Sequence, residues 1–338
     1  MDQRTRLLRV IEGKSVDRAP FICPGGMMNM TVTEVMQTGQ ALWPEAHRVP
    51  ETMARLALAA NRLAGVENVG VPFCMTVEAE AMGAPVEMGS LSTEPSIGGY
   101  IIARPEESER LALLDPAKGR ARVCVEAVRL LKREAPDVPV IANLTGPVSL
   151  ASSLLDPMVY YRALLLNKRG SHELMKVINY SLKRFGSALI EAGADVICIA
   201  DPSATGEIMG RKSFAAFALP YINELVEYFR ERHNVPAIVH ICGNVRTLGG
   251  ILAEIASEVI SVDALLSIKA LKELTPHKVT MGNVSTFLLA RGDAARIRRS
   301  GEVCLQRGVD ILAPACGVSP TTPLSGIRSL AQVVCSRD

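Results

Sequence analysis

The sequence is poor in aromatic residues and has no excess of charge of either sign. Only 4% of its 338 residues are Phe, Trp or Tyr, and 37 basic residues stand against 35 acidic ones, for a net charge of +2. A surface that stacks nucleic-acid bases needs aromatic side chains, and one that binds phosphates or an anionic membrane needs a basic excess. We therefore expect a protein that binds neither nucleic acid nor membranes.

Long apolar segments are also missing. No run approaches the roughly 20 residues that cross a bilayer, and the first residues, MDQRTRLLRVIEG, contain no apolar stretch typical of a secretory signal. We expect a cytoplasmic protein, in which thiols stay reduced. Its eight cysteines are then ligands, nucleophiles or packing residues and not a disulfide framework. Cys124, Cys198 and Cys304 lie within helical or apolar patterns, which favours packing.

Short apolar segments alternate with helical patterns along the whole chain. Eight segments have the composition of buried strands, at 18–23, 67–73, 138–144, 195–200, 237–243, 259–262, 278–282 and 310–313. Strands separated by helices pair in parallel through right-handed crossovers. The pattern predicts an α/β fold over 1–338, a single-domain (β/α)8 TIM barrel with an N-terminal helix at 2–12 and a small insert at 83–105, after the second strand.

The alternative fold is an open doubly wound sheet. Such a sheet commonly carries a glycine-rich phosphate loop, Gly-x-Gly-x-x-Gly, after its first strand. The corresponding stretch here is PGGMMNM at 24–30, which does not match. We therefore favour the barrel.

Catalytic groups of a barrel lie where its strands end. Each predicted strand ends at or near a polar or sulfur-containing residue: Cys23, Cys74, Asn143, Asp201, His240 with Cys242, Asp263, Asn283 and Cys316. Each residue alone is a weak signal, since Asp201 before Pro202 could simply begin a turn. As a set they predict a polar, ligand-rich ring at one end of the barrel.

Three members of this ring have the chemistry of a zinc site. His240 and Cys242 are two positions apart, so on an extended strand their side chains leave the same face. With Cys316 they offer two sulfurs and one imidazole, a set that selects zinc over magnesium or calcium and leaves a fourth position open. Asp263 is the nearest candidate for that position at rest. A structural zinc usually has four ligands in two close pairs, whereas Cys316 is distant in sequence, so we favour a catalytic metal.

Six stretches resemble the uroporphyrinogen decarboxylase superfamily: IANLTGPVSLAS (141–152), ICIADPSATGEI (197–208), VHICGNV (239–245), ISVDALLSI (260–268), MGNVST (281–286) and ILAPACGVSPTTPLSGI (311–327). Within it, the chain resembles the methylcobamide:coenzyme M methyltransferases over nearly its whole length. The most specific part is His-x-Cys followed by the cysteine of APAC. This resemblance implies that His240, Cys242 and Cys316 hold Zn²⁺.

The resemblance also implies a reaction. A methyl group would pass from a methylcobamide, a corrinoid carried by a small partner protein, to a thiol such as coenzyme M. Asp201, lining the pocket, and Asp263, beside the metal, would be the catalytic residues. We add four substrate-binding candidates, which are the strand-end residues Asn143 and Asn283 and the loop residues Met27 and Met28.

Three alternatives stay open. The acceptor could be a tetrahydrofolate or homocysteine in place of coenzyme M. The chain could be a decarboxylase-like lyase, but decarboxylases of this superfamily carry an arginine-rich segment after the first strand to bind carboxylates. The matching stretch here, ICPGGMMNM, contains no arginine. Lastly, the chain could bind a corrinoid without catalysis.

Overall fold

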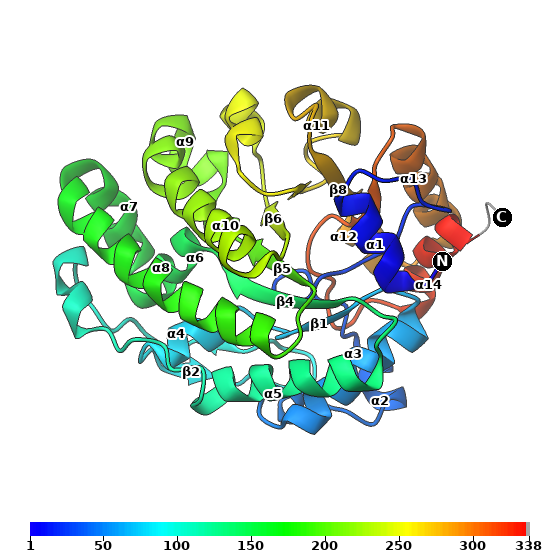
Figure 1. The fold of residues 1–338 in the computed structure, drawn as a ribbon, viewed down its shortest axis with the longest axis horizontal. Coiled ribbons are helices and arrows are strands. Elements are labelled where there is room, and N and C mark those ends of the chain that lie inside the picture. Colours follow the sequence, from blue (N-terminus) through cyan, green and yellow to red (C-terminus); the bar gives the residue numbers. More distant parts are fainter. Residues whose placement is uncertain (336–338) are drawn as a thin grey trace.

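The computed structural model describes residues 1–335 and contains a curled parallel sheet with helices on its outside (Figure 1). The seven strands of this sheet lie in the order β1 (Val69–Val71), β4 (Val140–Thr145), β5 (Val196–Ala200), β6 (Ala237–Ile241), β7 (Val259–Val262), β8 (Val279–Val284) and β9 (Ile311–Pro314). Nearly every strand residue is buried, as expected for parallel strands covered on both faces. The predicted α/β alternation is confirmed.

The helices alternate with the strands and cover the sheet, and the first three of them precede β1. They are α1 (Gln3–Ile11), α2 (Thr33–Thr38), α3 (Pro50–Ala64), α4 (Val77–Ala81), α5 (Gly119–Glu134), α6 (Pro147–Leu154), α7 (Pro157–Leu166), α8 (Lys168–Glu191), α9 (Gly206–Ser213), α10 (Leu219–His233), α11 (Ile268–Leu274), α12 (Thr286–Arg291), α13 (Ala294–Gln306) and α14 (Leu324–Cys335). Segments of 3-10 or π helix are η1 (Glu45–His47), η2 (Pro105–Arg110), η3 (Pro202–Ala204), η4 (Phe214–Ala218) and η5 (Arg246–Glu254). None of the helices within 1–335 combines the length and apolarity needed to span a membrane.

The first predicted strand, 18–23, is wrong as a regular strand. Only Phe21 forms a parallel bridge, to Leu312 of β9. The Ile22 N–H donates to the Leu312 carbonyl at 3.1 Å, and on the other side the Glu67 N–H donates to the Phe21 carbonyl at 2.7 Å. A longer ladder cannot form here because Pro20 and Pro24, which flank this bridge, have no N–H to donate. The sheet therefore has seven regular strands and not the eight predicted.

Between β1 and α5 the chain does not alternate regularly between a strand and a helix. After α4 the chain forms a two-stranded antiparallel hairpin of β2 (Val86–Glu87) and β3 (Ser96–Ile97), and then η2. Gly89 (φ +67°) allows the hairpin loop to turn, because a Cβ there would lie 2.1 Å from the Thr93 carbonyl oxygen. This hairpin brings Glu94 to the edge of the sheet where β9 ends, as described below.

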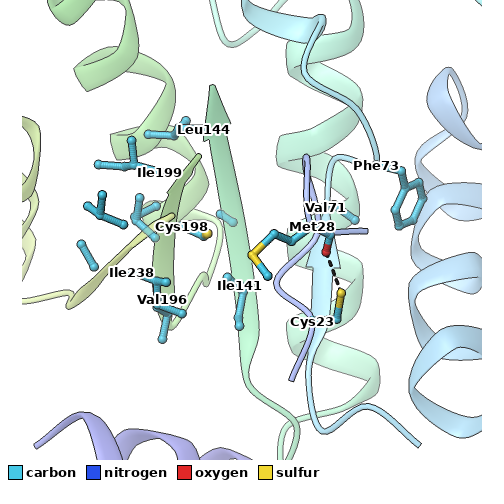
Figure 2. Packing of buried hydrophobic residues seen from close by; sticks show 14 of the residues in the cluster. Cys23, Met28, Val71, Phe73, Ile141, Leu144, Val196, Cys198, Ile199 and Ile238 are labelled. Atoms are coloured by element: carbon cyan, nitrogen blue, oxygen red, sulfur yellow. Dashed lines mark hydrogen bonds between the residues drawn. The ribbon is translucent and has the colours of Figure 1, made fainter. Parts of the chain in front are cut away.

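The core includes the cysteines that the sequence assigns to packing. Cys124 and Cys198 are fully buried and Cys304 is 7% exposed. Burial raises the pKa of Cys198 to about 12, so this thiol stays neutral. Figure 2 shows Met28 extending from the N-terminal segment toward the strand that carries Ile141. The methionine-rich segment 27–30 is therefore partly core and not wholly a mobile surface loop.

Candidate metal centre

His240 is a fully buried residue of the candidate site. It is the fourth residue of β6, is 0% exposed, and its Nδ1 lies 3.0 Å from Ser261 Oγ on the neighbouring strand β7. Its other ring nitrogen, Nε2, is also buried but has no hydrogen-bond partner. A buried polar atom without a partner costs about 1–3 kcal/mol, and such atoms in native structures call for an explanation. A ligand at Nε2 supplies one.

Cys242 and Cys316 meet His240 at this point. Cys242 follows β6 and Cys316 follows β9, and their sulfur atoms are 3.2 Å apart. The ligand atoms of His240, Cys242 and Cys316 all lie within 4.8 Å of one another. The structure therefore brings together the three side chains that the sequence groups as metal ligands. Among residues 1–335 this is the cluster of His, Cys, Asp or Glu side chains with the spacing of a metal site.

The two sulfurs differ in acidity. The hydrogen bond donated by the Cys242 thiol lowers the pKa of Cys316 and raises that of Cys242. Burial adds to the rise at Cys242. Of the two, Cys316 therefore ionises first, and the thiolate is the form that binds metals.

Asp263 lies beside Cys242, and Asn283 contacts the turn that carries Asp263. Asp263 Oδ2 is 3.2 Å from Cys242 Sγ, while its Oδ1 accepts from the Leu265 N–H at 3.2 Å. The Asn283 side-chain amide donates to the carbonyls of Asp263 (3.1 Å) and Leu266 (2.6 Å). Asn283 thus holds the turn that carries Asp263, and its amide nitrogen is occupied by the protein backbone.

Asp201 has a different set of partners. Its carboxylate accepts from the Val148 N–H (3.0 Å), the Ser149 N–H (2.8 Å) and the Ser149 hydroxyl (2.6 Å). These donors belong to the first turn of α6, where backbone N–H groups have no partner within the helix. Burial raises the pKa of Asp201 to about 6. The side-chain hydrogen bonds of Asp201 connect β5 to α6. Its link to His240 is through the backbone only, because the Asp201 N–H donates to the His240 carbonyl at 2.9 Å.

Asn143 binds the loop that follows the N-terminal bridge. Its amide donates to the carbonyls of Pro24 (2.8 Å) and Val71 (3.2 Å). Gly25 and Gly26 pack directly on this side chain, with positive φ angles of 110° and 56°, and leave no room for a Cβ. Asn143 Oδ1 is buried without a partner. The amide nitrogen therefore anchors the loop, and the oxygen is the atom left for another contact.

The two methionines of that loop lie on different sides of the site. Met28 is fully buried, and its Sδ lies 3.9 Å from Ser261 Oγ, behind His240. Met27 is half-buried and lines a groove of about 360 Å³ together with Cys316. Gly317 allows this approach, because a Cβ there would lie 2.1 Å from the Met27 carbonyl oxygen. Met27 is the methionine that a bound molecule can reach.

Two strand-end cysteines do not join the cluster. The Cys23 thiol donates to the Met28 carbonyl at 2.8 Å (Figure 2), and burial raises its pKa well above the usual value. Cys74 lies 3.3 Å from the guanidinium of Arg120. The nine strand-end residues predicted from the sequence thus divide into three converging ligands, an adjacent carboxylate, and residues that contact loops or helices of the chain.

Two residues near the cluster were not predicted. Ser261 orients His240, and its signal was only its place within a buried strand. Glu94 shares the groove beside Cys316, accepts from Asn29 Nδ2 at 2.7 Å, and has a pKa raised to about 7 by burial. It lies in the irregular region between β1 and α5, where no periodic pattern indicates which side chains point inward.

Comparison with known proteins identifies the family of the chain. The sequence profile of the uroporphyrinogen decarboxylase (URO-D) family matches residues 2–336. The chain belongs to this family. It is 33% identical to the methylcobamide:CoM methyltransferase MtaA of Methanosarcina barkeri, over 99% of this chain and 97% of that protein. It is 30% identical to the methylcobamide:CoM methyltransferase MtbA of Methanosarcina acetivorans, over 97% and 96%.

A solved structure shares the fold of this URO-D family chain. A methyltransferase from Methanosarcina mazei superposes with a TM-score of 0.92 at 33% sequence identity, covering 98% of each chain. The resemblance to the methylcobamide:coenzyme M branch, stated above from six sequence stretches, is confirmed by these relatives.

Proposed function

We propose that this chain is a methyltransferase that moves a methyl group from a methylated corrinoid to a thiol. The relatives at 30–33% identity over almost the whole chain are named for transfer from methylcobamide to coenzyme M. The observation that carries the proposal is the convergence of His240, Cys242 and Cys316, with His240 Nε2 buried and without a partner. This cluster provides a place where a thiol can be activated.

The three side chains fit a zinc ion. Two thiol sulfurs and one imidazole nitrogen are the ligand types that zinc takes in proteins, and three protein ligands leave a position for substrate. The unpartnered His240 Nε2 is the atom that would coordinate the metal. A zinc ion bound there would lower the pKa of an incoming thiol and so favour the nucleophilic thiolate.

The remaining residues of the site would position these ligands. Ser261 fixes the ring of His240 through Nδ1, which leaves Nε2 directed to the cluster. Asn283 holds the turn that places Asp263 beside Cys242. Asp263 would then be either a resting ligand or the acceptor of the proton that the thiol releases. Asp201 would act through α6, as a positioning residue.

The groove beside Cys316 is the side from which substrates would approach. Phe287 of α12 lines it and is 83% exposed, and Met27 lines it too. Such apolar surface suits the face of a corrinoid, presented by a small corrinoid protein.

We also propose that the chain is one domain and that segment 20–23, through the Phe21 bridge, completes the sheet as an eighth barrel member. A cytoplasmic location would suit reduced ligand thiols.

Metal analysis and a methyl-transfer assay test this function. Purified wild-type protein is expected to contain about one zinc per chain and to methylate a thiol from methylcobalamin. Cys316→Ala should lose zinc and at least about 100-fold of the activity, because a ligand is missing. The control is Cys335→Ala, which removes an exposed thiol outside the cluster and should change neither property.

The same assay separates the alternatives. Undiminished transfer by Cys316→Ala would contradict the proposed site. A decarboxylase-like lyase would keep its activity after chelation of the metal, whereas a corrinoid-binding module would bind methylcobalamin without any turnover. Methyl transfer that disappears on chelation and returns with zinc excludes both.

A further inference from the structure

The groove beside Cys316 has an uneven chemical lining. Its walls carry the apolar side chains Met27, Phe287, Ala290 and Val318, and hydroxyls from Thr286 and Ser319. Glu94 is the only charged residue among the described residues that line it. A molecule in this groove would therefore meet apolar walls, hydroxyls and one carboxylate, but no cation.

Glu94 is held in place on both sides. The tight turn at Gly89 shapes the hairpin loop that carries it, and Asn29 Nδ2 donates to its Oε1 at 2.7 Å. Asn29 is itself fixed, since its Oδ1 accepts from the Thr31 N–H at 2.7 Å and its carbonyl accepts from the Val318 N–H at 3.0 Å. Asn29 thus joins the hairpin to the loop that follows Cys316, so the carboxylate and the sulfur keep their relative positions.

Glu94 and Cys316 line the same groove. The carboxylate therefore lies on the side of the metal cluster from which a substrate thiol would arrive.

A nearby cation lies elsewhere. Arg246 is exposed at the start of η5, and its guanidinium donates to the Leu265 carbonyl at 2.6 Å, next to the Asp263 turn. It does not line the groove. A negatively charged group in the groove would face Glu94 without a compensating charge, while an ammonium group would pair with it.

Given the proposed methyl transfer, on which this step rests, we infer that the acceptor is an aminothiol, which places its ammonium group against Glu94 and its carbon chain along the apolar walls. The sulfonate of coenzyme M has the opposite charge. The inference concerns the class of acceptor and leaves the metal ligands and the corrinoid donor as proposed above.

Three thiols of equal length test it. Cysteamine, 2-mercaptoethanol and 2-mercaptoethanesulfonate share a two-carbon chain and carry a positive, no and a negative charge. The assay is run at about pH 8, where the Glu94 carboxylate, with its pKa of about 7, is mostly ionised. With the zinc-loaded enzyme and methylcobalamin, kcat/KM for cysteamine should then exceed that for the sulfonate by about tenfold, with 2-mercaptoethanol between them, as expected for one partly screened charge pair. Dissociation constants should follow the same order when each thiol is titrated into the cobalt(II)-substituted protein and the thiolate-to-cobalt absorption is followed.

Glu94→Gln isolates the charge, because glutamine keeps the oxygen that accepts from Asn29. This variant should reduce the cysteamine-to-sulfonate ratio by about tenfold in both measurements. The comparison of ratios cancels the different intrinsic acidities of the thiols. Glu87→Gln is the matched control, since Glu87 lies exposed on strand β2 of the same hairpin and does not line the groove. It should leave the ratio unchanged.

The outcomes separate this inference from the proposed function. A wild-type preference for the sulfonate, or a ratio that Glu94→Gln leaves unaltered, overturns the aminothiol assignment while methyl transfer stands. No turnover with any thiol, together with tighter cysteamine binding that depends on Glu94, overturns methyl transfer and supports charge selection. No turnover and equal binding of all three thiols contradicts both.

Discussion

The ends of β5 and β6 carry two fully buried polar side chains, Asp201 and His240, that differ in how their hydrogen-bonding atoms are used. Both oxygens of Asp201 accept from the first turn of α6. His240 has one nitrogen near Ser261 and the other without a partner. Strand position alone therefore does not identify a ligand. A buried side chain whose polar atoms all have partners in its own chain holds the fold together. One that keeps a polar atom without a partner can bind another group through that atom.

Of the changes at these two strand ends, removal of the His240 imidazole should have the largest effect, on bound zinc and on activity. His240→Ala is expected to reduce bound zinc from about one per chain to a small fraction, with a loss of at least about 100-fold in methyl transfer, because one of three ligands is gone. Elemental analysis after dialysis and the methylcobalamin assay measure both. The control is His277→Ala, an exposed histidine outside the cluster. Full zinc content in the His240 variant would show that His240 Nε2 does not bind the metal.

Asp201→Asn should have a smaller effect, on stability. The pKa of Asp201 is raised to about 6 by burial, above its value in an unfolded chain. Its protonated form therefore stabilises the fold below about pH 4, and this contribution is lost as the pH rises through about 6. Asparagine cannot ionise, so relative to wild type the variant should gain about 1–3 kcal/mol between pH 4 and pH 7.

Urea denaturation of the metal-free proteins across this range measures that difference. Zinc content at pH 7 should equal that of the wild type, since the Asp201 side chain bonds to Val148 and Ser149 and not to the ligand side chains. Parallel stability curves, or loss of zinc from the Asp201 variant, would show that the two strand ends are less different than their contacts indicate.

The metal cluster could be predicted because its signals are local. Soft ligand types follow apolar strands, and parallel strands of one sheet end at the same edge, so His240, Cys242 and Cys316 had to lie near one another. Whether each strand-end residue faces the site or its own backbone is a different matter. Asn143 and Asn283 donate to backbone carbonyls of neighbouring loops, and the positions of those carbonyls depend on loop geometry that residue type does not indicate.

Two other features lay beyond prediction from the sequence. Segment 18–23 has the apolar composition of a strand, yet Pro20 and Pro24 limit it to one bridge at Phe21. Glu94 lies in the irregular region between β1 and α5, where no repeat of period 2 or 3.6 assigns an inward face. Its place beside Cys316 follows from the turn at Gly89 and the hydrogen bond from Asn29, both of which are tertiary.

X-ray absorption at the zinc edge of the purified protein tests the central claim most directly. We expect two sulfur ligands at about 2.3 Å and the remaining nitrogen or oxygen ligands at about 2.0–2.2 Å, one of them an imidazole. A thiol substrate should add a third sulfur. A first shell of nitrogen and oxygen alone, or one that keeps two sulfurs in Cys316→Ala, would contradict it.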